Sequence, residues 1–212
     1  MPFFCIAMTA HHATPETSRR LRLKAATHDI HDVLDQRIMA FNPFADRTHY
    51  ADFLHTQFRL HRDVQVLFDD PNLNQLLPQL GQRSRLALVE QDLQDLGVAV
   101  PAQSLPPPAF TQGPAIDAAT ALGWLYAVEG SNIGAAFLLK FAAKLGLDAS
   151  HGACHLAPHP DGRAANWRNF IEQLDEVSLT AEEESRAVAG AQAAFSQVLA
   201  YVEQYCPLPA QA

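Results

Sequence analysis

The stretch Leu122 to Lys140, LGWLYAVEGSNIGAAFLLK, is a helix-length apolar run that glycines interrupt at positions 130 and 134. A glycine inside a helix costs about 1 kcal/mol relative to alanine, so two of them need an offsetting use. Gly130 and Gly134 are four residues apart and therefore share one helix face, where the missing Cβ atoms leave room for a close neighbour. That neighbour is either another helix or a flat ligand, and the pattern alone leaves both interpretations open.

Composition indicates one domain and excludes a general nucleic-acid binder. The chain has 212 residues, of which 48% are hydrophobic, which suffices for one sizeable core. We expect one helical domain over residues 15–206, with tails at 1–14 and 207–212. The 15 basic residues against 23 acidic ones give a net charge of -8, which is unfavourable for binding polyphosphate. A basic patch is therefore local, and Arg19, Arg20, Arg22 and Lys24 form one that could meet an anionic ligand or an acidic partner.

Cysteine usage and hydropathy predict a cytoplasmic protein that does not enter a membrane. Cys5, Cys154 and Cys206 are too few and too scattered for a disulfide framework, which favours a reducing compartment. No basic residue precedes the short apolar start, as a secretory signal would require. The apolar run around Gly130 carries polar residues in its centre and is not an uninterrupted membrane span.

Helical periodicity recurs through most of the chain, and no alternating strand pattern accompanies it. Thr14, Pro15 and Glu16 read as the cap and first turn of the first helix, and Thr180 with Glu183 reads as a capping box for the last. A proline-rich connector spans 98–114. The predicted helices cover residues 14–40, 46–69, 82–96, a glycine-interrupted segment ending near 145, 166–174 and 180–205. The fold class predicted from this pattern is all-α.

Polar residues break the apolar stripes of these helices at three points. Gln57 and His61 occupy inward positions of the second helix, and Arg85 lies near the inner face of the next. Buried polar groups need partners, so these side chains either bond to each other and the backbone or line a wet cavity. In the first helix, His31 stands at the edge of the apolar stripe and could lean over a cleft, with His28 as a rival three residues earlier.

The loop 151–162, HGACHLAPHPDG, is dense in possible metal ligands: His151, Cys154, His155 and His159. Its spacing superficially suggests zinc, but no second CxxC or HxxxH pair completes a site. Hydrogen bonds from the same side chains could equally hold the loop.

Two long blocks, GWLYAVEGSNIGAAFLLK and HGACHLAPHPDGR followed by NWRNF, resemble the bacterial haem oxygenases of the iron-acquisition type. The resemblance extends in weaker form from Arg19 to Phe195 and includes LKAATHDIHDVLD near the start. It implies a single-domain helical bundle that holds one haem between a proximal helix carrying a histidine and a kinked, glycine-rich distal helix. It also implies cleavage of haem, with dioxygen and electrons, to biliverdin, carbon monoxide and ferrous iron, which would release iron from haem.

The resemblance assigns the site residue by residue. His31 matches the proximal iron ligand and Lys24 a contact to a haem propionate. The distal-helix residues are Gly130, Ser131 and Gly134, and the distal waters are held by Gln57, His61, Arg85 and Trp167. We also expect Tyr126 and Phe195 to contact the haem. The chain departs from near relatives at Val198, where they carry a tyrosine that touches a propionate, and Tyr201 is a possible substitute.

The reaction needs electrons from outside, because the sequence has no glycine-rich nucleotide fingerprint after a strand. We expect a ferredoxin or a reductase of the ferredoxin/flavodoxin type as donor. Mainly the α isomer of biliverdin is expected, since Lys24 is retained and Phe141 stands where relatives of altered regiochemistry anchor a propionate. The alternative function is a non-catalytic haem carrier or sensor on the same fold. A helical hydrolase of the thiaminase type is disfavoured because no cysteine falls on a cavity-lining helix.

Overall fold

The computed structural model describes residues 18–101, 109–111 and 115–208, which form an all-α, single-domain bundle without strands. Two isolated bridges join Asp148 to His151 and Gly152 within a loop. In chain order, the elements are α1 (Arg19–Phe41), α2 (Arg47–Asp69), α3 (Pro71–Leu76), the 3-10 helix η1 (Leu80–Arg83), α4 (Leu86–Asp95), α5 (Ala118–Lys144), the 3-10 helix η2 (Cys154–Leu156), α6 (Arg163–Glu176) and α7 (Ala181–Tyr205).

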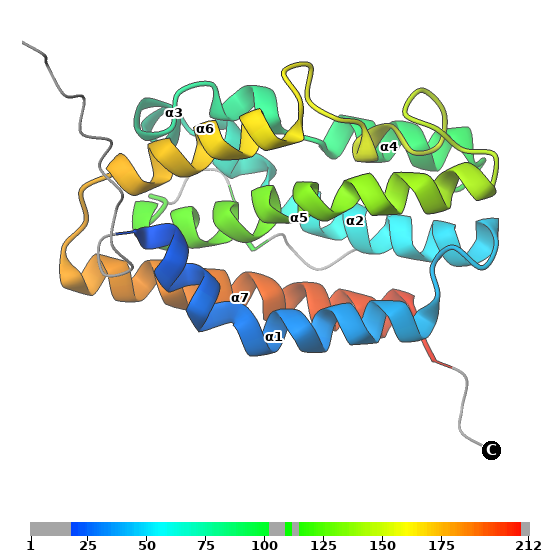
Figure 1. Cartoon of the computed structure of the whole chain (residues 1–212), viewed down its shortest axis with the longest axis horizontal. Helices are drawn as coiled ribbons and strands as arrows, with labels where there is room; N and C mark the ends of the chain where they lie inside the picture. Colours follow the sequence, from blue (N-terminus) through cyan, green and yellow to red (C-terminus); the bar gives the residue numbers. More distant parts are fainter. Residues whose placement is uncertain (1–17, 102–108, 112–114, 209–212) are drawn as a thin grey trace, which may run out of the picture.

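Helix α5 runs through the middle of the bundle and packs most extensively against α7, which also packs along α1 (Figure 1). Two glycines outside the GxxxG stretch make this close approach possible. A Cβ atom at Gly123 would lie 2.0 Å from the carbonyl oxygen of Ala187, and one at Gly190 would lie 2.4 Å from that of Thr120. Backbone packing of α5 on α7 therefore depends on Gly123 and Gly190.

The starts of α2 and α7 agree with the sequence prediction. Asp46 caps α2 by accepting from the backbone of His49, and Thr180 and Glu183 form the predicted capping box of α7. The first helix differs from the prediction because it begins at Arg19, where the Ser18 side chain accepts from the third residue of the helix. The expected cap at 14–16 lies outside the described residues.

The segment around Arg85 is shorter and more broken than its periodicity indicates. The predicted helix 82–96 is replaced by η1 and by α4, which starts at Leu86, and Arg85 is the residue that precedes it. The short helix α3, for which Asp70 is the cap and Pro71 the first residue, was not predicted. Arg85 therefore leaves the inner helix face and enters a turn.

The buried side chains form two hydrophobic cores, one at each end of the bundle. On α5, Val128 belongs to one core and Ala135 to the other; on α1, Leu23 and Leu34 are divided in the same way. The α5 segment 130–134 lies between the two cores and belongs to neither. None of the helices in the described part of the chain is long and apolar enough to cross a membrane.

Candidate functional site

A cavity of about 680 Å³ opens between α1 and α5, at the gap between the two cores. Its volume falls within the range of about 300–1,000 Å³ that is usual for small-molecule and cofactor sites. Ten of the eleven site residues expected from the sequence line it: Lys24, His31, Gln57, His61, Tyr126, Gly130, Ser131, Gly134, Trp167 and Phe195. The sequence prediction thus converges on one place, with Arg85 as the exception.

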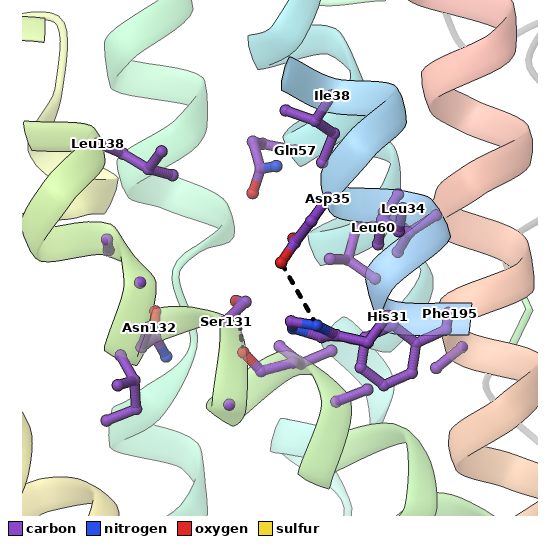
Figure 2. Close-up of a pocket in the computed structure, with 18 of the residues that line it drawn as sticks. His31, Leu34, Asp35, Ile38, Gln57, Leu60, Ser131, Asn132, Leu138 and Phe195 are labelled. Carbon is purple, nitrogen blue, oxygen red and sulfur yellow. Dashed lines mark hydrogen bonds and ion pairs between the residues drawn. The ribbon is translucent and has the colours of Figure 1, made fainter. Parts of the chain in front are cut away.

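His31 lies on the α1 wall and faces α5 across the cavity (Figure 2). Its side chain is 51% exposed, and its Nδ1 atom lies 3.4 Å from a carboxylate oxygen of Asp35, one turn later on the same helix. The ring packs edge-on against Phe195 of α7, with centroids 5.4 Å apart. Since Asp35 takes the Nδ1 side, the Nε2 atom remains available to a metal, the arrangement typical of histidine ligands.

His28 also lines the cavity, so position alone does not exclude it as a ligand. Its side chain is 67% exposed, and its Nε2 atom lies 3.6 Å from Asp32. No ring contact to His28 occurs among the described residues, whereas Phe195 supports His31. His31 is therefore the better positioned of the two.

The α5 wall is open where its glycines face the cavity. A Cβ atom at Gly134 would meet nothing within 4 Å, and one at Gly130 would make only an ordinary contact, at 3.7 Å, with the Trp167 ring. Packing between helices therefore does not require glycine at either position. The Ser131 hydroxyl donates to the carbonyl of Val128 at 2.7 Å, and α5 changes direction beside Ser131 (Figure 2).

The rest of the lining is mainly apolar and partly open to solvent. Phe137 and Met39 are 67% and 65% exposed, although both border the cavity. Exposed large apolar side chains beside a cavity are typical of a surface that a ligand covers. The chain thus offers a broad apolar slot with an imidazole on one side and an open helix backbone on the other.

His61 brings a buried, neutral polar group to the cavity. Burial, together with the nearby charges of His155 and Arg85, lowers the pKa of His61 to about 3. The ring is 4% exposed, and its Nδ1 atom has no partner among the described residues. A buried polar atom without a protein partner is usually satisfied by water, so this end of the cavity suits ordered water.

His155 also lines the cavity, although the sequence indicated it only as part of a ligand-rich loop. Its Nδ1 atom lies 2.6 Å from Asp92 of α4, and its Nε2 atom has no partner among the described residues. Asp92 also accepts from the backbone N–H groups of Cys154 and His155, at 2.6 and 2.9 Å. The sequence gives no signal that Asp92 pairs with His155, because the two residues lie 63 positions apart in the chain.

Arg85 does not line the cavity. Its guanidinium donates to the carbonyl oxygens of His155 and Ala157, at 2.6 and 3.1 Å, and borders a neighbouring pocket of about 150 Å³. It therefore supports the segment that carries His155. Arg85 therefore does not contact the cavity directly. It can influence water there only by positioning the segment that carries His155, or from the neighbouring pocket.

The cations near the start of α1 divide between the fold and the cavity. Arg19 and Arg22 both pair with Glu184 of α7, each at 2.8 Å. Arg20 and Lys24 line the cavity instead. Among the residues that the structure describes, they are the only arginine or lysine residues that do so.

Val198 borders the cavity, but Tyr201 does not. Tyr201 is 4% exposed, and its hydroxyl bonds to Asp63 and to Arg59. It is therefore engaged elsewhere and does not reach the cavity that Val198 borders.

The four possible zinc ligands of the loop 151–162 do not converge. In the described residues, the one group with suitable ligand geometry is Asp92, Asp95 and Cys154. The bonds of Asp92 to His155 and to the backbone already account for its burial. The loop is held by hydrogen bonds, which was the second interpretation of its sequence.

Comparison with known proteins gives concordant matches. The family model described as Heme oxygenase matches residues 18–204. Heme oxygenase PigA of Pseudomonas aeruginosa is 38% identical over 185 residues, which cover 87% of this chain and 91% of that protein. A heme oxygenase of Xanthomonas campestris pv. campestris is 30% identical over 150 residues, covering 69% and 86%.

Two solved structures have the same architecture. The NO- and CO-bound heme oxygenase of Neisseria meningitidis superposes with a TM-score of 0.83 at 40% identity, covering 92% of this chain and 95% of that one. Heme oxygenase 2 of Chlamydomonas reinhardtii, without heme, gives a TM-score of 0.68 at 18% identity, covering 92% and 100%, and supports the fold alone.

Proposed function

This chain belongs to the haem oxygenase family, and from that premise we propose how its cavity holds haem and which residues act in the cleavage. It is an enzyme of haem degradation. The overall reaction converts haem, dioxygen and electrons to biliverdin, carbon monoxide and ferrous iron. Haem is both the substrate and the group that activates dioxygen, so the protein supplies binding, orientation and protons.

The residues of the cavity fit haem on three counts. The slot is broad and apolar, which suits the macrocycle; His31 presents a free imidazole nitrogen; and Arg20 with Lys24 supplies positive charge for carboxylates. The observation that carries the proposal is that His31 faces the α5 segment around Ser131 across the cavity (Figure 2), and that a Cβ atom at Gly134, which lines the same cavity, would meet nothing within 4 Å. We infer that His31 ligates the iron and that Asp35 orients its ring.

Residues Gly130, Ser131 and Gly134 would lie over the opposite face of the haem. The open space beside Gly134 would let haem and a small molecule lie against the α5 backbone, with no side chain at position 134 in the way. Gly130 brings the α5 backbone near Trp167, which borders the same region. None of the three residues carries a titratable side chain, so this wall would shape the site rather than supply protons.

Ordered water would hold and transfer protons at this face. Gln57, His61 and Trp167 line the cavity, and the unpartnered nitrogens of His61 and His155 are suited to anchor water. His61 is neutral near pH 7 because burial lowers its pKa, so it acts as a hydrogen-bond partner rather than as a charged acid. Arg85 contributes by fixing the carbonyl of His155.

We propose a separate electron donor of the ferredoxin or ferredoxin/flavodoxin reductase type. The described residues include no strand, whereas the dinucleotide fingerprint is a turn between a strand and a helix. We also propose mainly the α isomer of biliverdin. Lys24 borders the cavity at the start of α1, whereas Phe141 at the other end packs against Phe44 and cannot bind a carboxylate.

We propose a cytoplasmic location. Cys154 and Cys206 are free thiols, which is typical of a reducing compartment.

One assay tests the function against a haem carrier. Purified protein is mixed with haemin, a reductant is added in air, and the Soret band is followed while biliverdin and carbon monoxide are measured. The proposal predicts loss of the band with release of both products, and separation of the biliverdin isomers should give α as the major one. A band that persists under reduction would indicate a carrier, and no band would contradict both functions.

A further inference from the structure

The side chain of Arg20 differs from those of its basic neighbours in the partners that it makes. Arg19 is 3% exposed, donates to two backbone carbonyls at the end of α6 and pairs with Glu184, as Arg22 also does. The main-chain N–H of Arg20 donates to Asp175, which fixes the start of the helix. Its guanidinium makes no ion pair or hydrogen bond with any other residue that the structure describes. The half-buried charge of Arg20 is therefore available to a ligand.

The position of Arg20 directs that charge into the cavity. Arg20 and Lys24 are four residues apart, so they lie on one face of α1, and both line the cavity. That face continues to His31, the proposed iron ligand. The acidic residue among the lining side chains is Asp35, which lies beyond His31 and is engaged by it. Positive charge is thus concentrated at the end of the cavity nearest the start of α1.

The charge of Arg20 also reaches the opposite wall. Burial raises the pKa of Tyr126 on α5, and the positive charge of Arg20 opposes that rise. The Tyr126 ring is 9% exposed, packs 6.0 Å from that of Trp167 and lines the cavity. Arg20, Lys24 and Tyr126 therefore form one polar part of the cavity lining, which carries positive charge.

Resting on the proposed function, we infer that Arg20 binds a propionate of haem and, together with Lys24, fixes the rotation of the macrocycle in the slot. Haem has two carboxylates at one edge, and a single lysine supplies one point charge. A guanidinium binds a carboxylate through two parallel hydrogen bonds and so restricts its orientation. Tyr201 is engaged by Asp63 and does not line the cavity, so Arg20 is the second cation that this end of the cavity offers to a carboxylate.

The experiment compares haemin with its dimethyl ester, in which both propionates are masked. Both are titrated into wild-type protein and into Arg20→Gln, Arg20→Lys and Arg22→Gln, and dissociation constants are taken from the Soret band. We expect Arg20→Gln to weaken haemin binding about 5- to 10-fold, the range for a charge-assisted hydrogen bond reduced by partial exposure. Binding of the ester should not change, and Arg20→Lys should restore part of the affinity. Arg22→Gln is the matched control and should leave the ratio of haemin to ester affinity unchanged.

Rotation of the macrocycle is tested by the products. Arg20→Gln should raise the fraction of biliverdin isomers other than α. Thermal unfolding of the haem-free variant should stay within about 2 °C of the wild type, since the Arg20 side chain makes no ion pair or hydrogen bond with a described residue. Equal loss of affinity for haemin and ester, or no loss for either, would overturn the inference while leaving the proposed function intact. Wild-type protein that binds neither compound would contradict the proposed function itself.

Discussion

The imidazole of His155 is held by Asp92, whose carboxylate oxygen lies 2.6 Å from the ring Nδ1 atom, while the ring Nε2 atom has no partner among the described residues. Asp92 also accepts two backbone N–H groups from the loop that carries His155. This one carboxylate therefore fixes both the loop and the orientation of a histidine that borders the cavity.

Replacing Asp92 with asparagine should destabilise the protein by about 1–3 kcal/mol, because buried N–H groups lose a charged acceptor. Burial raises the pKa of Asp92, but the hydrogen bonds from His155 and the backbone outweigh it, so the pKa falls below its ordinary value of 3.8. A carboxyl whose pKa is lower in the folded protein than in the unfolded chain stabilises the fold when the pH is above the unfolded-state pKa. This stabilisation is lost as the pH falls through the folded-state pKa. Urea unfolding at several pH values should show a steeper loss below about pH 4 in the wild type than in Asp92→Asn. Identical acid limbs would contradict the assignment.

His61 should cause a second pH dependence of the free energy of unfolding, because its pKa is lowered by burial and not by hydrogen bonds. Burial lowers its pKa to about 3, so below the unfolded value of about 6.5 the unfolded chain binds a proton that the folded protein does not. The free energy of unfolding should therefore fall as pH drops from about 6.5 towards 3, by up to about 1.4 kcal/mol per pH unit. His61→Gln should flatten this slope in haem-free protein, and His151→Gln, a change at a 56% exposed side chain, is the matched control. A slope unaffected by His61→Gln would show that other groups cause it.

The two pairs of glycines on α5 and α7 should respond to alanine in opposite ways. Gly134→Ala adds a methyl group to open space within a helix and should stabilise the haem-free protein by about 0.5–1 kcal/mol. Gly123→Ala would bring a Cβ atom to 2.0 Å from the backbone of α7 and should destabilise it by about 1–3 kcal/mol or more. Denaturant unfolding measures both changes.

A bulky residue at Gly134 separates its effect on the ligand from its effect on the fold. Gly134→Phe should leave the circular dichroism spectrum and the unfolding midpoint near those of the wild type, while haemin binding and turnover fall sharply. Full turnover by a stable Gly134→Phe variant would show that the open face of α5 has no part in catalysis.

The periodicity of the sequence was enough to predict most of the helices, because their caps are local. Asp46, Thr180 and Glu183 carry their signal within one turn, and α2 and α7 begin where these residues indicate. The breaks in the apolar pattern at Gln57 and His61 fall on two residues that line the cavity, since a polar side chain in an apolar stripe needs an aqueous or polar partner.

What the sequence did not reveal depends on contacts between distant segments. Two contacts join residues far apart in the chain: the hydrogen bond of His155 with Asp92 and the ion pair of Arg19 with Glu184. No local sequence pattern predicts such contacts. The helical period of the sequence continues through residues 82–85, but the chain forms the end of a 3-10 helix there and Arg85 caps α4, so periodicity alone does not place Arg85. The GxxxG pattern was ambiguous by itself, and the empty space beside Gly134 favours a ligand over a packed helix.

The identity of the iron ligand is the central claim, and the absorption spectrum of the ferric haem complex tests it most directly. His31→Ala and His28→Ala are prepared as a matched pair, since both residues line the cavity on α1 and both are exposed enough to be removed without loss of the fold. We predict that His31→Ala loses the histidine-ligated spectrum and reduces turnover to the level of free haemin, that added imidazole restores the spectrum, and that His28→Ala retains both spectrum and turnover. Loss of the spectrum in His28→Ala, with His31→Ala unchanged, would contradict the account.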